Sequence, residues 1–224
     1  MRAPAWIALG LVACDPATSR GTSAPDVSIS NSSVISATTA PAPTTSASTS
    51  ASAHTSAPPA QSPCPGGFRC GAPVPPDAVI DLALFEKRAH RLSLVSGQDV
   101  AKTYAVALGS GGMGQKGYEG DKTTPMGRYE VTAIIKNTKW HTYLALDYPN
   151  AEDIARYEAL VAKGAAPAGV GAGSGIAIHG RRADMIDGLH KLVDWTLGCV
   201  SLDNAEIDEV ASRVKKGTPV WIRE

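Results

Sequence analysis

Two residues of the sequence have the chemistry of a thiol-dependent enzyme. Cys199 follows Gly198, and His179 lies twenty positions earlier, directly before Gly180. A glycine beside the sulfur leaves room for a substrate carbonyl and lets backbone N–H groups point at it. An imidazole can accept the thiol proton or pair with the thiolate, which makes the sulfur a nucleophile near neutral pH. The alternative is an inert buried cysteine and a core histidine.

The four cysteines divide by their surroundings. Cys64 and Cys70 bracket a short turn-rich segment, where a disulfide suits an exported protein. A metal pair is the alternative, but no second Cys or His pair lies nearby in the sequence at ligand spacing, so no metal site is expected. Cys14 lies in an N-terminal segment that predicts lipidation of its thiol, as described next. Cys199 therefore remains as the candidate reactive thiol.

The N-terminus predicts export. Met1-Arg2 is followed by an apolar run over residues 5–13, which is shorter than the roughly 20 residues of a membrane span. A charged start, a short apolar stretch and small residues are typical of a signal peptide, here residues 1–13. The sequence before Cys14 resembles a bacterial lipobox, which predicts a lipidated Cys14 and a membrane-anchored lipoprotein facing the periplasm or cell wall. Ordinary signal cleavage nearby is the alternative.

Composition divides the rest of the chain. Residues 14–62 consist mostly of Ser, Thr, Ala and Pro and predict a disordered tether. A flexible chain of that length spans roughly 35–40 Å. Residues 63–76 form a short disulfide-closed segment, and residues 77–224 form the ordered domain. The formal net charge is +0 and no basic stripe is present, which argues against nucleic acid as a partner.

The ordered part predicts a mostly β (α+β) domain. Apolar and polar residues alternate in several short runs typical of strands; the expected strands are residues 79–86, 90–96, 100–109, 128–136, 143–148 and 219–223. Apolar residues recur at helical spacing over residues 151–163, which Gly164 ends. Asp203 with Glu206 predicts the start of another helix, closed by Gly217. We therefore expect two or three helices in the C-terminal half.

The glycine-rich loop at residues 109–114 happens to match the spacing of a dinucleotide-binding motif. More glycines and a proline follow within residues 117–127, so no helix can begin there to bind a phosphate. We interpret the segment as a long connection between strands.

Three segments together resemble the catalytic domain of the L,D-transpeptidases, the YkuD-type fold, over residues 79–222. They are Gly-Asp-Lys-Thr-Thr-Pro-Met-Gly-Arg-Tyr at 120–129, Ile-His-Gly at 178–180, and Gly-Cys-Val at 198–200 with Asp203-Asn204 beyond. Residues 146–153 are similar to a subgroup that includes an amidase releasing a lipoprotein from peptidoglycan. The resemblance implies a β-sandwich or barrel and a role in cell-wall biogenesis and cell shape.

The resemblance also implies a mechanism. The Cys199 thiolate attacks the carbonyl between the third residue of a peptidoglycan stem peptide and its terminal D-alanine, with His179 as general base and then acid. Backbone groups of Gly198, Cys199 and Gly180 would hold the oxyanion. An amine resolves the thioester into a crosslink or attaches a protein to the wall, whereas water makes the enzyme a carboxypeptidase or amidase. No cofactor is required, and a carbapenem would be a covalent inhibitor.

The sequence departs from the family pattern at two places. The family usually has Ser-His before Gly-Cys, where this chain has Thr196-Leu197, and an arginine two positions after the cysteine, where this chain has Ser201. Arg181 or Arg182 could replace that arginine. The remaining substrate contacts suggested by the resemblance or by position are Thr196, Tyr148 and Asn150. An inactive wall-binding lipoprotein on the same scaffold is a further alternative.

Other residues near the motif receive mainly structural interpretations. His190 is expected to be solvated, and His141 to lie on the surface or line the substrate cleft. Asp184 and Asp187 could orient His179, although loop carboxylates usually face water. A sortase-like enzyme is disfavoured because its histidine and cysteine lie farther apart in sequence. An NlpC/P60-type peptidase has its cysteine before its histidine, and a zinc peptidase needs a third ligand.

Overall fold

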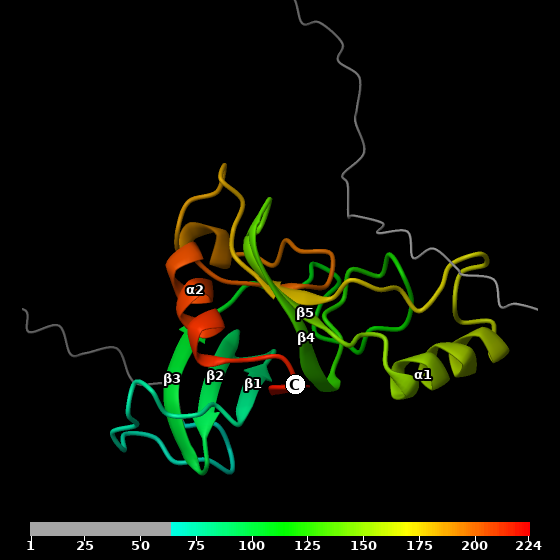
Figure 1. Ribbon diagram of the computed structural model, residues 1–224. Coiled ribbons are helices and arrows are strands. Elements are labelled where there is room, and N and C mark those ends of the chain that lie inside the picture. The colour runs from blue at the N-terminus through cyan, green and yellow to red at the C-terminus, as the bar shows by residue number, and fades with distance from the viewer. Residues whose placement is uncertain (1–63) are drawn as a thin grey trace, which may run out of the picture. The chain divides into compact units, whose positions relative to one another are not determined.

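The computed structural model describes residues 64–224. The predicted signal peptide, the lipidation site Cys14 and the predicted tether lie outside the described residues. The domain is mostly β, with eight strands and two α-helices in its C-terminal half (Figure 1). The strands are β1 (Leu82–Glu86), β2 (Arg91–Ser96), β3 (Asp99–Ala105), β4 (Gly127–Thr138), β5 (His141–Leu146), β6 (Ala177–His179), β7 (Val200–Ser201) and β8 (Pro219–Arg223). The helices are α1 (Ala151–Ala162) and α2 (Asn204–Arg213), with one 3-10 turn, η1 (Leu189–Lys191).

The strands form one sheet in the order β3-β2-β1-β8-β4-β5-β6-β7. Strands β1 to β3 are joined as antiparallel hairpins. The last strand, β8, lies in the middle of the sheet, parallel to β1 and antiparallel to β4. Strands β5 and β6 are antiparallel, and β6 and β7 are parallel.

A backbone bridge brings the two ends of this strand order together. Ala107, in the segment after β3, exchanges two hydrogen bonds with Ser201 of β7, at 3.0 and 2.9 Å. The sheet thereby curls towards a barrel, as the resemblance implied. This closure fixes β7, the strand that directly follows Cys199.

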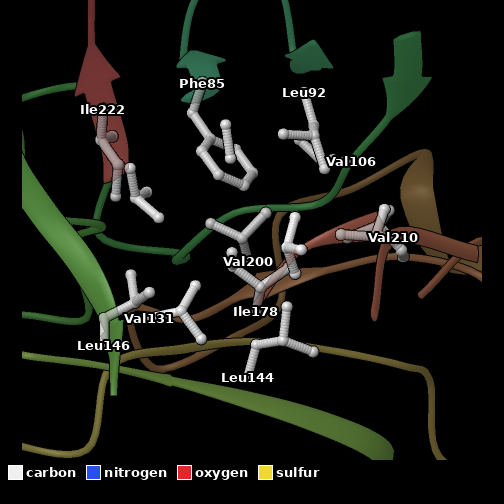
Figure 2. Close-up of a cluster of buried hydrophobic side chains, with 14 of the residues drawn as sticks. Phe85, Leu92, Val106, Val131, Leu144, Leu146, Ile178, Val200, Val210 and Ile222 are labelled. Atoms are coloured by element: carbon white, nitrogen blue, oxygen red, sulfur yellow. The ribbon is translucent and has the colours of Figure 1, made fainter. Parts of the chain in front are cut away.

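The main core lies against one face of the sheet, where α2 covers it, and contains aliphatic residues from almost every strand (Figure 2). Figure 2 labels Phe85, Leu92, Val106, Val131, Leu144, Leu146, Ile178, Val200, Val210 and Ile222. Val200 and Ile178 are fully buried, so hydrophobic packing anchors the strands on either side of the candidate site.

A smaller cluster forms on the other face of β1 to β3. Leu84, Val95 and Val100 pack there against Phe68 and Cys64. Cys64 and Cys70 form a disulfide. Backbone hydrogen bonds of Arg69 with Gln98 and Val100, at 2.8 Å each, fasten this segment to the β2–β3 hairpin. The disulfide-closed segment is therefore packed onto the domain.

Several predicted elements begin or end elsewhere. β1 starts at Leu82 rather than at residue 79, and β3 ends at Ala105 rather than at residue 109, because the chain leaves β2 there to meet β7. The predicted strand at residues 143–148 starts two residues earlier and ends at Leu146. No helix begins in the glycine-rich loop at residues 109–114. Within residues 64–224, no helix is both long and apolar enough to cross a membrane.

Candidate active site

His179 and Cys199 lie on neighbouring parallel strands. In the register of β6 and β7, Ile178 pairs with Val200 and His179 pairs with Ser201. Paired residues point to the same face of a sheet, and side chains along a strand alternate between faces. Cys199 directly precedes β7, so this register brings the segment that carries the sulfur next to the strand that carries His179.

Cys199 is a half-buried thiol on a tightly built turn. Its Sγ lies 3.5 Å from the carbonyl oxygen of Gly175. Gly198 has φ +129, and a Cβ there would lie 2.9 Å from Ile176 and 3.0 Å from the Thr123 carbonyl oxygen. Only glycine fits this position without strain. Glycine at this position therefore lets Ile176 and the Thr123 carbonyl pack against the turn, whereas the motif had predicted space for a substrate carbonyl.

His179 is enclosed by aromatic rings and only 2% exposed. The aromatic cluster consists of Trp140, Tyr143 and Trp195, with ring centroids 4.9, 6.2 and 6.0 Å from the imidazole. His179 Nδ1 lies 2.6 Å from the carbonyl oxygen of Gly180, which can only accept. Nδ1 therefore carries the proton, and Nε2 keeps its lone pair.

Burial sets the protonation state of this imidazole. Loss of solvation lowers the pKa of His179 to about 4, although the hydrogen bond to Gly180 opposes the shift. The ring is therefore neutral at pH 7. A neutral imidazole with a lone pair on Nε2 is the form that a general base requires.

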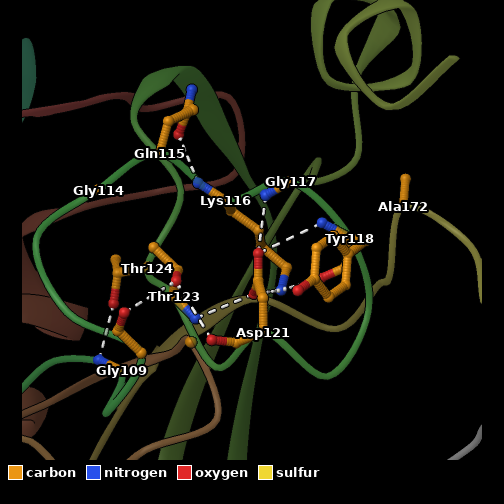
Figure 3. A network of polar contacts seen from close by, with 12 residues as sticks. Gly109, Gly114, Gln115, Lys116, Gly117, Tyr118, Asp121, Thr123, Thr124 and Ala172 are labelled. Carbon is orange, nitrogen blue, oxygen red and sulfur yellow. Dashed lines mark hydrogen bonds and ion pairs between the residues drawn. The ribbon is translucent and has the colours of Figure 1, made fainter. Parts of the chain in front are cut away.

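A polar network holds the loop that packs on Gly198 (Figure 3). The Asp121 carboxylate accepts from the N–H groups of Gly117, Tyr118 and Thr123 and pairs with Lys116 Nζ at 2.6 Å. Burial favours a higher pKa for Asp121, but these hydrogen bonds outweigh it and lower the pKa. The loop is thereby held by an ionised carboxylate.

Lys87 ties the same loop to β1. Its side chain is buried, and Nζ donates to the carbonyl oxygens of Gly114 and Thr124 at 2.6 and 2.7 Å. Thr124 Oγ1 in turn accepts from the N–H of Gly109. Nothing in the sequence around Lys87 predicted this role, because its partners lie 27 and 37 residues away. Asp121, by contrast, lies in the segment at residues 120–129 that carries part of the family resemblance.

Thr196 and Gly180 have structural roles in place of the predicted ones. Thr196 is buried, and its Oγ1 donates to the carbonyl oxygen of Cys199 at 2.6 Å and accepts from Gly198 N–H at 3.2 Å. It shapes the turn and cannot also face a substrate. The N–H of Gly180 donates to Thr142, so it is not available to an oxyanion. The contribution of Gly180 is its carbonyl, which orients His179.

Tyr148 and Asn150 are also corrected. Tyr148 is buried, and its hydroxyl donates to the Ala172 carbonyl oxygen at 2.7 Å. Asn150 is the N-cap of α1, where its side chain accepts from two backbone N–H groups and donates to the Arg128 carbonyl oxygen. Both predictions rested on a neighbouring sequence segment, and local hydrogen bonding uses these side chains instead.

The charged residues after His179 pair with one another. Arg181 pairs with Asp187 at 2.5 Å, and Arg182 pairs with Asp184 at 2.5 Å. The two aspartates therefore do not orient His179. A substrate carboxylate could recruit Arg181 only by competing with Asp187.

The two other histidines of this region differ. His141 is partly exposed and pairs with Asp208 at 2.7 Å. His190 was expected to be solvated, but it is 7% exposed and lies 2.8 Å from Asp203. The sequence did not predict the burial of His190, because its partner Asp203 lies 13 residues further along the chain. Within residues 64–224, no group of three or more His, Cys, Asp or Glu side chains is placed to hold a metal ion.

The comparison with protein families agrees with this geometry. The model of the YkuD L,D-transpeptidase catalytic domain matches residues 79–222. The chain belongs to the L,D-transpeptidase catalytic-domain family. The match contains both His179 and Cys199, together with the loop around Asp121. No curated protein matches the chain.

Several solved structures are similar to this L,D-transpeptidase-type domain. The helical cell shape determining protein Pgp2 from Campylobacter jejuni has 25% sequence identity and a TM-score of 0.48; the match covers 66% of this chain and 49% of Pgp2. An L,D-transpeptidase from Xylanimonas cellulosilytica has 17% identity and a TM-score of 0.42, with 67% and 64% covered. The L,D-transpeptidase LdtMt1 in complex with imipenem has 12% identity and a TM-score of 0.41, with 63% and 58% covered. The chain thus spans about half the length of Pgp2.

Proposed function

We propose that this protein is a cysteine-dependent L,D-transpeptidase that acts on peptidoglycan stem peptides through a thioester on Cys199. The observation that supports it is a neutral, buried His179 on β6, whose partner strand β7 directly follows the half-buried Cys199. Family membership supplies the substrate class. The geometry supplies the candidate nucleophile and base.

The first half-reaction breaks an amide and forms a thioester. His179 Nε2 takes the Cys199 thiol proton, and the sulfur attacks the carbonyl carbon on the donor side of the terminal D-alanine. The backbone N–H of Cys199 stabilises the oxyanion, a contribution of about 2.7–4 kcal/mol per donor in other enzymes. The Gly198 N–H, predicted as a second donor, is bonded to Thr196 Oγ1 instead. When the tetrahedral intermediate collapses, the C–N bond breaks and His179 protonates the leaving amine.

The second half-reaction decides between crosslinking and hydrolysis. An acceptor amine attacks the thioester carbonyl, His179 accepts its proton, and the departing sulfur recovers the thiol. The carbonyl is then part of a new amide. Water in place of the amine would leave a carboxylate, as in a carboxypeptidase or amidase.

The test uses a mass shift and then a product analysis. The purified protein is incubated with a carbapenem, and intact-mass spectrometry should show one covalent adduct that is absent from Cys199→Ala. Incubation with purified muropeptides should then yield crosslinked dimers with loss of D-alanine. Cleaved monomers without dimers would make the protein a hydrolase. The absence of both adduct and products would leave the wall-binding alternative.

We also propose that the domain is exported and anchored to a membrane through a lipid on Cys14. The lipobox-like sequence before Cys14 supports this, and residues 14–62 would be the tether. Metabolic labelling with a clickable fatty acid should mark the wild type in a bacterial host and leave Cys14→Ser unmarked. Equal labelling of both would contradict the anchor.

A further inference from the structure

His190 is a buried histidine with a fixed tautomer. Its Nε2 lies 2.8 Å from Asp203 Oδ1. Asp203 also accepts from the Gly188 N–H at 2.8 Å and pairs with Lys191 Nζ at 2.7 Å. Burial favours a higher pKa for Asp203, but the hydrogen bonds from its three partners outweigh burial and lower the pKa. Because the carboxylate accepts from Nε2, Nε2 carries a proton, and in that tautomer of the imidazole Nδ1 has the lone pair.

That lone pair faces a buried interior without a partner. Within residues 64–224, His190 Nδ1 and the indole Nε1–H of Trp195 are both buried and both lack a hydrogen bond. Their rings meet edge to face, with centroids 6.3 Å apart and an angle of 77°. One atom is an acceptor and the other is a donor. A direct bond after a small ring movement, or one shared water, would satisfy both.

Trp195 contacts both His190 and the candidate base His179. Its indole lies edge to face against the His179 imidazole, with centroids 6.0 Å apart, and is tilted against Trp140 at 5.7 Å. Trp195 also begins the turn that leads through Thr196 to Cys199. A shift of the indole would therefore disturb both the imidazole and the segment that carries the sulfur.

We propose that His190 is a positioning residue, and that a hydrogen-bond chain from Asp203 through His190 to the Trp195 indole holds the His179 ring in place for proton transfer. The role in proton transfer rests on the proposed function of Cys199 and His179. The existence of the chain does not, and it can be tested without any activity.

The chain is tested first by spectroscopy on the full-length protein. The sequence has four tryptophans, so Trp195→Phe assigns one indole signal among four in a ¹⁵N–¹H spectrum. We expect the Trp195 Nε1–H to exchange slowly with solvent and to move in His190→Gln. Glutamine can still donate to Asp203 but places no acceptor where Nδ1 stood. An indole signal that exchanges fast, or that stays unmoved in His190→Gln, would overturn the proposal.

The positioning role is tested by a double-mutant cycle on the rate of carbapenem acylation of Cys199. His190→Gln and Trp195→Phe should each lower this rate about fivefold, as expected for the loss of one neutral hydrogen bond. If both act through one chain, the double variant should lose no more than either single variant. A loss of about 25-fold in the double variant would mean independent effects and would contradict the chain.

Control measurements distinguish failure of the hydrogen-bond chain from failure of the proposed function and from failure of a variant to fold. His141→Gln makes the same exchange in another histidine–aspartate pair that does not contact Trp195, and its rate should stay within about twofold of the wild type. If the wild type itself is not acylated, the proposed function fails while the indole spectrum still decides the chain. If His190→Gln does not fold, Trp195→Phe alone must show the rate loss, because phenylalanine keeps an aromatic ring there but removes the N–H.

Discussion

The loop at residues 109–127 and the aromatic cluster around His179 both bury polar side chains. In the loop, no buried side-chain nitrogen or oxygen lacks a hydrogen-bond partner, and Asp121 alone accepts from four donors (Figure 3). Around His179, four buried polar atoms have no hydrogen bond in the structure: His190 Nδ1 and Trp195 Nε1, which the proposed chain would join, and Ser201 Oγ and Asn204 Oδ1, which it leaves without a partner.

This difference indicates that the loop has mainly a structural role and the aromatic cluster mainly a functional one. A fully satisfied network stabilises one conformation, whereas buried groups without partners cost free energy and persist where another requirement keeps them. The loop provides a fixed wall for Gly198. The aromatic cluster keeps His179 neutral at a cost in stability. Variants in the loop should therefore affect folding, and variants in the cluster should affect the reaction.

The largest effect is expected on the reaction. His179→Gln should lower the rate of Cys199 acylation by about 10²–10⁴-fold, because no side chain is left to take the thiol proton. Time-resolved intact-mass spectrometry measures the rate, and thermal unfolding shows whether the variant is folded. A folded variant with less than a tenfold loss would assign the base to another group.

A loop variant should instead lower stability. Asp121→Ala leaves the Lys116 ammonium buried without its counter-charge, and we expect the free energy of unfolding to fall by about 3–5 kcal/mol. Urea unfolding measures it, and Lys116→Met combined with Asp121→Leu is the matched control, which should recover part of the loss. A change below about 1 kcal/mol would show that the network is not needed for stability.

The pH dependence of stability should reveal the low pKa that burial among the aromatic rings gives to His179. The pKa of His179 falls to about 4 in the folded state from 6.5, so the unfolded chain binds more protons between these values. This group should therefore lower the free energy of unfolding by about 3 kcal/mol as the pH falls from 6.5 to 4. Unfolding curves of His179→Gln should lack this slope. Parallel curves for both proteins would contradict the low pKa.

The smallest effect is expected at an exposed pair. His141 and Asp208 lie 2.7 Å apart, but their side chains are 38% and 50% exposed. His141→Gln should change the free energy of unfolding by less than about 0.5 kcal/mol, because solvent screens the pair. Urea unfolding checks this. A larger loss would mean that the left-handed backbone at His141 matters more than its ion pair.

The longer elements were predictable because their side chains alternate or recur with a clear period. The strand Pro219–Arg223, helix α1 and the start of α2 follow such patterns and capping residues, but α2 ends at Arg213 and not at Gly217 as predicted. β6 and β7 contain three and two residues, too few for any period, yet they flank the site. His179 and Cys199 were found from motif chemistry instead.

Side-chain direction and distant partners were not predictable. Tyr148 and Asn150 lie in a segment that resembles a functional one, but sequence does not say that one hydroxyl turns inward and the other side chain caps a helix. The partners of Lys87 and His190 lie far along the chain, and only the fold brings them together. The satisfied loop and the unsatisfied cluster could therefore not be distinguished from sequence.

The central place of β8 has a consequence for how the domain assembles. Without Pro219–Arg223, the sheet divides into β3-β2-β1 and β4-β5-β6-β7, each with an open edge where β8 belongs. Two such halves expose strands that pair readily with other chains. Pairing of these two parts through the middle of the sheet therefore depends on this one strand, and the Ala107–Ser201 bridge links them only at their other ends.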